Sequence, residues 1–553
     1  APRRKDGARA MAHELTQETI DAVAAIFDKA VAEHRMAGVA WGIASGGEVL
    51  ASGGAGSSAL AGGDRAEEAF TPRVDSISRI ASMTKSFTAA TILALRDEGK
   101  LRLDNPIATY VPAAAHIGSF SEDSPALTLR HALTMSAGFV TDNPWGDRQE
   151  SMSTDEFDEY IAGGLSLIAE PGCGFEYSNT GFVLLGRVID EVTGVSFRDE
   201  IRRRFIDPLG MKDTVFSLAE MTDDQRSRVL TGHRVGDGEG AKRFEEVDFD
   251  TPGAFGAMAG LFSTVADVAK WTAFLAEVGV HGADGVSDDS RAMLSPASRR
   301  EMQEIHRIQE WPVLEDGNGF GRVRGYGYGL VVEKFPKLGD VISHSGGYPG
   351  YGSYMVWLRG TGLTVIALAN SKYAPAIPCS LDALEAIRTH QAELVDAPKR
   401  ELAPTTRDAL EKALAWLRDV ELEGQPTTLV PSGSARTVLA NRAKQGVSEE
   451  SDPLLALFAT NMDQDVSRAE RVRLRDAALR IAGLDRADLT LEKAASLKVL
   501  SPFQAVCTFE GESGKVLIDL LMDPRKNSQI QALNIKGESK DKGEASGAAP
   551  IGI

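Results

Sequence analysis

The chain has 553 residues, a formal net charge of −19, 43% hydrophobic residues and 25% charged residues. This length accommodates two domains, and the composition is typical of a folded globular protein rather than a disordered one. The negative charge argues against a nucleic-acid partner and against anchoring on an anionic membrane surface, because both require clustered Lys and Arg, and no apolar run is long enough to span a membrane.

The cysteines and the N-terminal residues indicate a compartment. Cys173, Cys379 and Cys507 are far apart and form no C-x-x-C pair, which favours a reducing compartment over a disulfide framework. Residues 1–10 are basic and polar without an apolar segment behind them, so we expect a cytoplasmic protein; the alternative is an exported protein whose signal was removed before residue 1. No H-E-x-x-H motif or close Cys/His cluster occurs, so we expect no metal and no other cofactor.

The first part of the chain predicts a helix followed by a β-hairpin. Apolar residues recur at helical spacing over residues 17–35, which is typical of an amphipathic helix. Residues 39–45 and 49–54 then predict two strands around a turn that contains Gly46 and Gly47.

A serine and a lysine stand three positions apart at the start of the next predicted helix, residues 82–98. On a helix this spacing places Ser82 and Lys85 on one face. A serine hydroxyl needs a neighbouring base to act as a nucleophile, and a lysine can be that base when burial or positive neighbours lower its pKa. The free backbone N–H groups of a helix start can stabilise a developing oxyanion. This Ser-x-x-Lys motif is weak alone, since residues 539–542 repeat it in a polar tail.

Two later motifs strengthen the hypothesis. Tyr177-Ser178-Asn179 follows a glycine-bearing loop and precedes a predicted helix at residues 182–193. His344-Ser345-Gly346-Gly347 lies between two predicted strands, where glycines allow a substrate to approach the backbone closely. Each motif alone also fits a purely structural role, as a packed tyrosine ring or a Gly-rich turn.

Together and in this order, the three motifs resemble those of the serine β-lactamase and penicillin-binding-protein superfamily. The similarity is greatest to its class C-like serine hydrolases, the branch that includes esterases and D-aminopeptidases. It extends from about Gly38 to Asn370 and includes residues 127–138, 252–264 and 328–330. The resemblance implies an α/β (α+β) fold, in which an antiparallel sheet has flanking helices and a mostly helical subdomain.

The resemblance also implies a role for each motif residue. Ser82 would be acylated, and Lys85 and Tyr177 would serve as general base and acid. Asn179 would orient the substrate amide or the lysine. The backbone N–H groups of Ser82 and Gly347 would form an oxyanion hole. The remaining substrate-binding candidates are His344, Ser345 and Gly346.

His344 departs from the superfamily pattern, because β-lactamases and carboxypeptidases carry a lysine there. A histidine is largely neutral at pH 7 unless its pKa is raised, so we do not expect His344 to bind a substrate carboxylate. The sequence therefore predicts a serine hydrolase acting on small esters, amides or short peptides. The alternatives are a penicillin-binding-type sensor, or a D-Ala carboxypeptidase or β-lactamase with little or no ester turnover.

The rest of the chain predicts the domain organisation. We expect a serine hydrolase domain over residues 1–395, a linker over 396–405, a C-terminal α+β domain over 406–535 and a disordered tail over 536–553. Residues 279–318 are either a lid or a solvated surface excursion. The C-terminal domain carries no catalytic motif. It serves either as a dimerisation element or as a wall of the substrate pocket, and the first alternative predicts a homo-oligomer. Its predicted strands are 503–509, 516–522 and 530–535.

Overall fold

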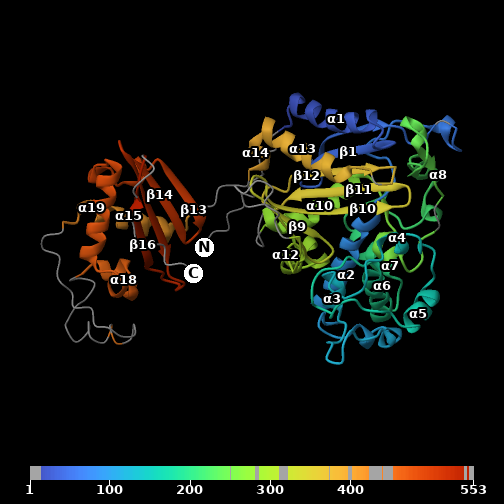
Figure 1. Ribbon diagram of the computed structural model, residues 1–553, viewed down its shortest axis with the longest axis horizontal. Helices are drawn as coiled ribbons and strands as arrows, with labels where there is room; N and C mark the ends of the chain where they lie inside the picture. The colour runs from blue at the N-terminus through green and yellow to red at the C-terminus, as the bar shows by residue number, and fades with distance from the viewer. Residues whose placement is uncertain are drawn as a thin grey trace. The chain divides into compact units, whose positions relative to one another are not determined.

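The computed structural model describes residues 14–60, 62–248, 251–280, 285–310, 322–372, 374–396, 401–421, 437, 439, 452–540 and 545–546. The chain forms two compact units, residues 1–397 and 398–553 (Figure 1). The division falls within the expected linker, of which residues 397–400 lie outside the described part of the chain.

The first unit is built on an eight-stranded antiparallel sheet with the order β2-β1-β12-β11-β10-β9-β8-β7. The N-terminal hairpin joins the sheet beside its last strand, since Val39 pairs with Ala369 and Ala44 with Thr364. The strands are β1 (Gly38–Ser45), β2 (Glu48–Gly56), β7 (Arg307–Glu310), β8 (Val323–Tyr326), β9 (Val331–Phe335), β10 (Gly339–Tyr348), β11 (Tyr351–Leu358) and β12 (Thr364–Ala369). The predicted antiparallel sheet with flanking helices is confirmed.

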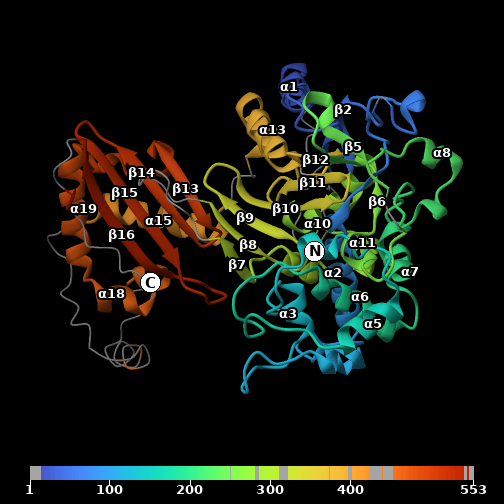
Figure 2. The same ribbon diagram turned by 45° about the vertical axis from the view of Figure 1, so that its right-hand side comes forward.

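Each face of this sheet packs against its own layer of helices. Helices α1 (Gln17–Ala32) and α13 (Ala376–His390) cover one face, and α10 (Val265–Val280) lies on the other, as Figures 1 and 2 show. Side chains of a strand alternate between faces, so Val365 and Ala367 of β12 face the first layer while Ile366 and Leu368 face the second. Both faces are therefore apolar.

Helix α2 (Thr84–Asp97) runs through the interior of the second layer, with every residue from Thr84 to Leu95 buried. Small side chains permit this close packing, and at Gly329 a Cβ would lie 2.7 Å from the Lys85 carbonyl oxygen. The remaining helices of this unit are α3 (Leu129–Leu133), α4 (Asn143–Gly146), α5 (Thr154–Ala162), α6 (Asn179–Thr193), α7 (Phe197–Ile201), α8 (Asp223–Ser227), α9 (Gly256–Ala259), α11 (Asp288–Met293), α12 (Pro296–Met302) and α14 (Ala392–Val395). Two short ladders pair β3 (Ser78–Arg79) with β6 (Phe262–Ser263) and β4 (His233–Val235) with β5 (Phe244–Glu246).

Two predicted elements of the first unit need correction. Ser82 lies in a 3-10 turn, Ala81–Met83, and α2 begins only at Thr84. The described part of segment 279–318 contains two helices, α11 and α12, and the edge strand β7. It is thus largely part of the folded unit, while residues 281–284 and 311–318 lie outside the described residues.

The second unit has an antiparallel sheet, β13-β14-β15-β16-β17, with helices packed on one face. Val516, Ile518 and Leu520 alternate into its core. The strands are β13 (Ser496–Ser501), β14 (Gln504–Glu510), β15 (Gly514–Met522), β16 (Ile530–Ser539) and β17 (Ala545–Ser546), and the helices are α15 (Pro404–Asp419), α17 (Leu454–Leu457), α18 (Thr460–Asp465) and α19 (Arg468–Ala482).

The predicted start of the disordered tail, Lys536, is wrong, because β16 continues to Ser539. The alternation of inward and outward residues persists there. Gly537 faces α19, where a Cβ would lie 2.8 Å from Cα of Ala478, and Glu538 pairs with Lys536 on the outer side. The later tail residues 541–544 and 547–553 lie outside the described part of the chain.

Candidate active site

Ser82 is presented to a cavity by a constrained turn that follows strand β3. Its predecessor Ala81 has a φ of 49°, a left-handed conformation that costs a non-glycine residue about 1–2 kcal/mol. The backbone of Ile80 fixes the turn, since its N–H donates to Leu261 (3.0 Å) and its carbonyl accepts from the Ser353 hydroxyl (2.9 Å). Ser82 is consequently held between β11 and the segment that leads into β6.

Lys85 is completely buried one turn along, with its amine directed at Ser82. Nζ donates to Ser82 Oγ (3.0 Å), to Asn179 Oδ1 (2.8 Å) and to the Met258 carbonyl oxygen (3.2 Å). Burial lowers the pKa of Lys85 to about 7, against the opposing effect of two carboxylates, Asp147 and Asp142. A substantial fraction of the amine is therefore neutral near pH 7 and carries a free lone pair.

The start of helix α6 places Asn179 beside Lys85. Ser178 caps this helix by accepting from the Gly181 N–H (3.3 Å). Asp142 accepts from the N–H groups of Asn179 (2.6 Å) and Thr180 (2.8 Å) and from the Thr180 hydroxyl (2.6 Å). The carboxylate lies at the positive end of the helix dipole, which is its favourable position.

The Asn179 side chain is oriented at both of its ends. Oδ1 accepts from Lys85, and Nδ2 donates to Oδ1 of Asn143 (3.2 Å). Since Asn143 itself lines the cavity, residues 142–143 connect the substrate-facing wall with the buried lysine.

Tyr177 projects from the loop before α6 over Ser82 and Lys85. Its ring centroid lies 4.9 Å from Lys85 Nζ. Burial raises the pKa of the Tyr177 hydroxyl, while a hydrogen bond with Ser82 opposes that shift. The phenol therefore remains protonated at neutral pH.

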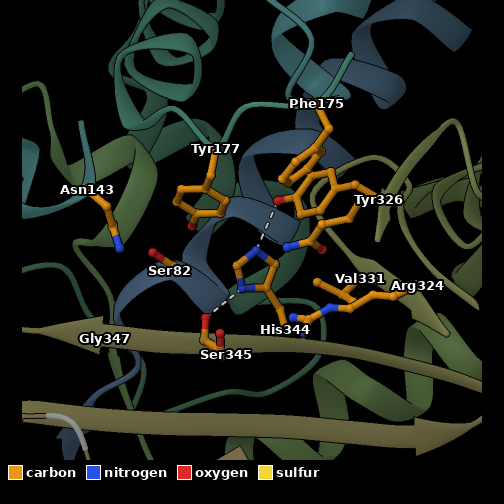
Figure 3. A pocket seen from close by; sticks show the side chains of 11 residues that line it. Ser82, Asn143, Phe175, Tyr177, Arg324, Tyr326, Val331, His344, Ser345 and Gly347 are labelled. Carbon is orange, nitrogen blue, oxygen red and sulfur yellow. Dashed lines mark hydrogen bonds between the residues drawn. The ribbon is translucent and has the colours of Figure 1, made fainter. Parts of the chain in front are cut away.

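His344 is neutral and engaged at both ring nitrogens. Nδ1–H donates to the Ser345 carbonyl oxygen (2.6 Å), so Nε2 accepts from the Tyr326 hydroxyl (3.0 Å), as the dashed lines in Figure 3 show. Burial, with a smaller effect from Lys85, lowers the pKa of His344 to about 3. The expected neutral histidine thus occurs in the structure, held by a tyrosine that sequence reasoning did not single out.

The two glycines after Ser345 have different surroundings on β10. A Cβ at Gly346 would lie 2.1 Å from Ser353 Oγ and 2.3 Å from the Ile80 carbonyl oxygen, whereas a Cβ at Gly347 would have no neighbour within 4 Å. Only glycine at position 346 allows β10 to approach the turn that carries Ser82. Gly347 faces the cavity.

The cavity has a volume of about 200 Å³. Five of the predicted site residues line it, namely Ser82, Tyr177, His344, Ser345 and Gly347. The structure places the other three, Lys85, Asn179 and Gly346, behind these walls. The lining residues that sequence analysis missed are Asn143, Phe175, Gln309, Arg324, Tyr326 and Val331. Of these, Tyr326 stands two residues before a segment that the sequence did single out, residues 328–330.

No group of three His, Cys, Asp or Glu side chains within the described residues is arranged to hold a metal ion. None of the helices that these residues form is long and apolar enough to cross a membrane.

Residues 23–390 match the Beta-lactamase family. Penicillin-binding protein 4* of Bacillus subtilis (strain 168) is 25% identical over 316 residues, which are 54% of this chain and 62% of that protein. The D-alanyl-D-alanine-carboxypeptidase/endopeptidase AmpH of Escherichia coli (strain K12) is 26% identical over 292 residues, 52% of this chain and 69% of AmpH. The chain thus spans less than two thirds of the first relative's length.

Solved structures with the same fold extend over different parts of the chain. The octameric penicillin-binding protein homologue from Pyrococcus abyssi aligns with 95% of this chain and 94% of its own, at a TM-score of 0.52 and 20% identity. A class C beta-lactamase mutant covers 67% and 97% (TM-score 0.52, 16% identity). The D-amino acid amidase from Ochrobactrum anthropi SV3 covers 68% and 99% (TM-score 0.53, 24% identity). At these identities the likeness shows the fold alone.

Proposed function

Because the chain belongs to the beta-lactamase family, whose members are serine hydrolases, we propose that it cleaves small esters, amides or short peptides through an acyl-enzyme on Ser82. The observation that carries this proposal is the buried Lys85 amine, 3.0 Å from Ser82 Oγ and with a pKa lowered to about 7. An amine of that pKa is a competent base for a serine at neutral pH.

Acylation begins with the neutral Lys85. The amine accepts the hydroxyl proton of Ser82 while Oγ forms a bond to the substrate carbonyl carbon. The negative charge that develops on the carbonyl oxygen is stabilised by backbone N–H donors, for which Ser82 and Gly347 are the proposed pair. Asn179 orients the Lys85 amine, because its Oδ1 accepts a hydrogen bond from Nζ.

Collapse of the tetrahedral adduct breaks the carbonyl C–O or C–N bond. Tyr177, protonated at rest, gives its proton to the leaving oxygen or nitrogen and regains one from the Lys85 ammonium. Water then attacks the acyl carbon and loses a proton to Lys85, and Ser82 Oγ recovers its proton as the acid departs. The cycle consumes one water and returns every side chain to its starting state.

The cavity supports a small substrate. Its volume of about 200 Å³ lies below the roughly 300–1,000 Å³ of pockets that enclose drug-sized ligands. The wall is largely polar, and within it Phe175, Tyr177 and Tyr326 offer aromatic surface to a short acyl or aryl group.

Mass spectrometry after brief exposure to p-nitrophenyl acetate or a fluorophosphonate tests the proposal. We expect one adduct, located on Ser82, that is absent from Ser82→Ala and present in Ser539→Ala, which alters the other Ser-x-x-Lys sequence. Labelling that persists undiminished in Ser82→Ala would refute the assignment. A stable adduct without turnover would instead support the alternative of a sensor that is acylated once.

A further inference from the structure

Strand β10 has a sheet partner on both sides along its first half and on one side along its second half. Its register with β9 ends at Ser343, whereas its register with β11 continues to Tyr348. Among the strands that the structure describes, residues 344–348 are therefore paired with β11 alone. The Gly347 N–H, the proposed oxyanion donor, belongs to this one-sided segment.

Two consecutive glycines make the backbone of the one-sided segment easy to rotate. Gly346 and Gly347 have no Cβ, so each can adopt a wider range of φ and ψ than other residues. A side chain cannot stiffen the strand at position 346, because a Cβ there would lie 2.3 Å from the Ile80 carbonyl oxygen. The orientation of the Gly347 N–H must therefore be fixed by contacts that the neighbouring residues make.

The carbonyl oxygen of Ser345 makes such a contact, since it accepts from Nδ1–H of His344 (2.6 Å). A carbonyl oxygen can only accept, so this bond requires the proton of the neutral ring to be on Nδ1. In the other tautomer, an unprotonated Nδ1 would face the oxygen and their lone pairs would repel each other. The Ser345 carbonyl belongs to the peptide unit directly before the one that carries the Gly347 N–H. The tautomer of His344 thus determines whether this backbone is fixed.

The hydroxyl of Tyr326 favours the Nδ1–H tautomer. It lies 3.0 Å from Nε2 of His344, which is its one hydrogen-bond partner within the described residues. Tyr326 is 1% exposed, so the other tautomer would leave a buried O–H group without an acceptor. The Tyr326 ring is held against Phe175, with 5.8 Å between the ring centroids. Figure 3 shows the two hydrogen bonds that connect Tyr326 through His344 to Ser345.

We propose that Tyr326 is a positioning residue for acyl transfer: its hydroxyl keeps His344 in the Nδ1–H tautomer, which fixes the Ser345 carbonyl and thereby orients the Gly347 N–H towards the oxyanion. Tyr326 acts through His344. This role requires a neutral ring, which is present because burial lowers the pKa of His344 to about 3. The inference rests on the proposed acylation of Ser82 and adds a residue to it.

A pair of substrates tests the effect on the oxyanion. The pair is p-nitrophenyl acetate and its thiono counterpart, in which sulfur replaces the carbonyl oxygen while the acyl methyl and the leaving group stay the same. Donors positioned for an oxygen anion favour the ester. In Tyr326→Phe, which keeps the ring and removes the hydroxyl, we expect kcat/KM for the ester to fall about tenfold or more. The kcat/KM for the thionoester should fall less, so the ratio of the two should decrease.

Nitrogen-15 NMR of the histidine rings in the full chain tests the tautomer directly. The chain has nine histidines, and His344→Gln identifies the signals of His344 by their loss. We expect the Nδ1–H form in the wild type and a population of the Nε2–H form in Tyr326→Phe. A wild-type His344 in the Nε2–H form would overturn the inference, and this measurement does not depend on the folding of any Tyr326 variant.

Tyr354→Phe is the matched control. Tyr354 is 3% exposed and belongs to the hydrophobic cluster on the other face of the same sheet, and its hydroxyl forms a hydrogen bond with Ser343 of β10. This variant also loses a buried tyrosine hydroxyl beside β10, but it should retain both the substrate ratio and the tautomer of the wild type.

An unchanged substrate ratio in Tyr326→Phe, or an equal decrease in Tyr354→Phe, would overturn the inference while leaving the proposed function intact, provided that ester cleavage depends on Ser82. Absence of both ester cleavage and an adduct on Ser82 in the wild type would instead overturn the proposed function, and this inference with it.

Discussion

The protonation state of Lys85 should govern the pH dependence of activity. Its pKa is lowered to about 7 by burial, and Asp147 and Asp142 raise it again. The kcat/KM for a neutral ester should therefore rise with pH through a midpoint near 7, because only the neutral amine accepts the serine proton. Asp147→Asn removes a charge that raises the pKa, so the midpoint should move to lower pH. Stopped-flow or steady-state rates between pH 5 and 9 measure both.

Burial raises the pKa of Asp147 to about 6, so its carboxyl loses its proton in the lower part of this pH range, below the Lys85 midpoint, and this step is absent from Asp147→Asn. His344 is neutral across the range because its pKa is lowered to about 3, and the Tyr177 pKa is raised by burial. Lys372, 3.6 Å from Asp147, stays in place in the variant. The exposed Asp155→Asn serves as the control and should leave the midpoint unchanged. An upward shift in Asp147→Asn would contradict the assignment of Lys85 as the base.

The side chains that meet at Ser82 differ in how far the sequence could predict them. Ser82 and Lys85 are three positions apart, so helical geometry alone predicts their contact. Asn179 belongs to a recognisable loop-to-helix motif. Arg324 could not be predicted, because its place in the cavity depends on the order of β8, β9 and β10 in the sheet, which no local pattern encodes.

At the scale of an element, Gly346 controls how closely β10 approaches the Ser82 turn. A Cβ there would lie 2.3 Å from the Ile80 carbonyl oxygen, so Gly346→Ala must displace either β10 or the turn. We expect acylation of Ser82 to slow at least a hundredfold, since about 1 Å of misplacement costs roughly that much. The thermal midpoint of the first unit should also fall. Labelling kinetics and calorimetry measure these effects.

Gly347→Ala is the neighbouring control, since nothing lies within 4 Å of its Cβ position and its backbone N–H is retained. Its unfolding midpoint should match that of the wild type. If both alanine variants were equally stable and equally fast in acylation, the close approach at Gly346 would have no functional consequence.

The start of α6 is the second element whose position matters to the site. Asp142 accepts three hydrogen bonds there, and Asp142→Asn weakens them by removing the negative charge from the helix N-terminus. We expect kcat to fall about tenfold with little change in KM, and stability to fall by about 1 kcal/mol, the usual value of a helix cap. Thr180→Val removes only the hydroxyl bond and should have a smaller effect on kcat. Equal losses in the two variants would indicate a local packing effect rather than an effect of the carboxylate.

Elements were predictable where hydrophobic periodicity was regular. Helix α1 and the β1–β2 hairpin occur close to their predicted limits, because apolar residues recur at helical spacing in α1 and because Gly46 and Gly47 mark the turn between the two strands. Strand β13 was missed although Ser496 and Lys498 alternate with Leu497 and Val499, because so short an alternation is not distinctive without the pairing with β14. The extension of β16 past Lys536 was missed for the same reason. Its outward residues are charged, which is also typical of a disordered tail, and only their pairing with β15 identifies them as part of a strand.

At the scale of the whole molecule, the two units have separate hydrophobic cores. Calorimetry should therefore show two unfolding transitions, one for each unit. In the second unit, Arg475 is 2% exposed and donates to the carbonyl oxygens of Leu417 (2.5 Å) and Val420 (2.8 Å) at the end of α15. Arg475→Met should destabilise that unit alone, by about 1–3 kcal/mol, because the buried carbonyl oxygen of Leu417 loses this donor, whereas that of Val420 keeps a hydrogen bond from Arg486 Nη1 (3.3 Å).

Arg473→Met provides the control for this experiment, since Arg473 lies two positions away on the same helix and its side chain is 61% exposed. It should change neither transition measurably. A single transition that shifts as a whole in Arg475→Met would show that the units unfold together.

The pairing of Val39 with Ala369 also determines when the catalytic unit can fold during translation. The hairpin formed by β1 and β2 leaves the ribosome long before its partner strand β12, which follows most of the unit in the chain. Until then one edge of the hairpin is unpaired and apolar residues such as Trp41 lack their partners, an arrangement that exposes nascent chains to misassociation. A chaperone that binds the unpaired hairpin would therefore act until β12 has been made, and expression should depend more on chaperone supply than the stability of the finished fold suggests.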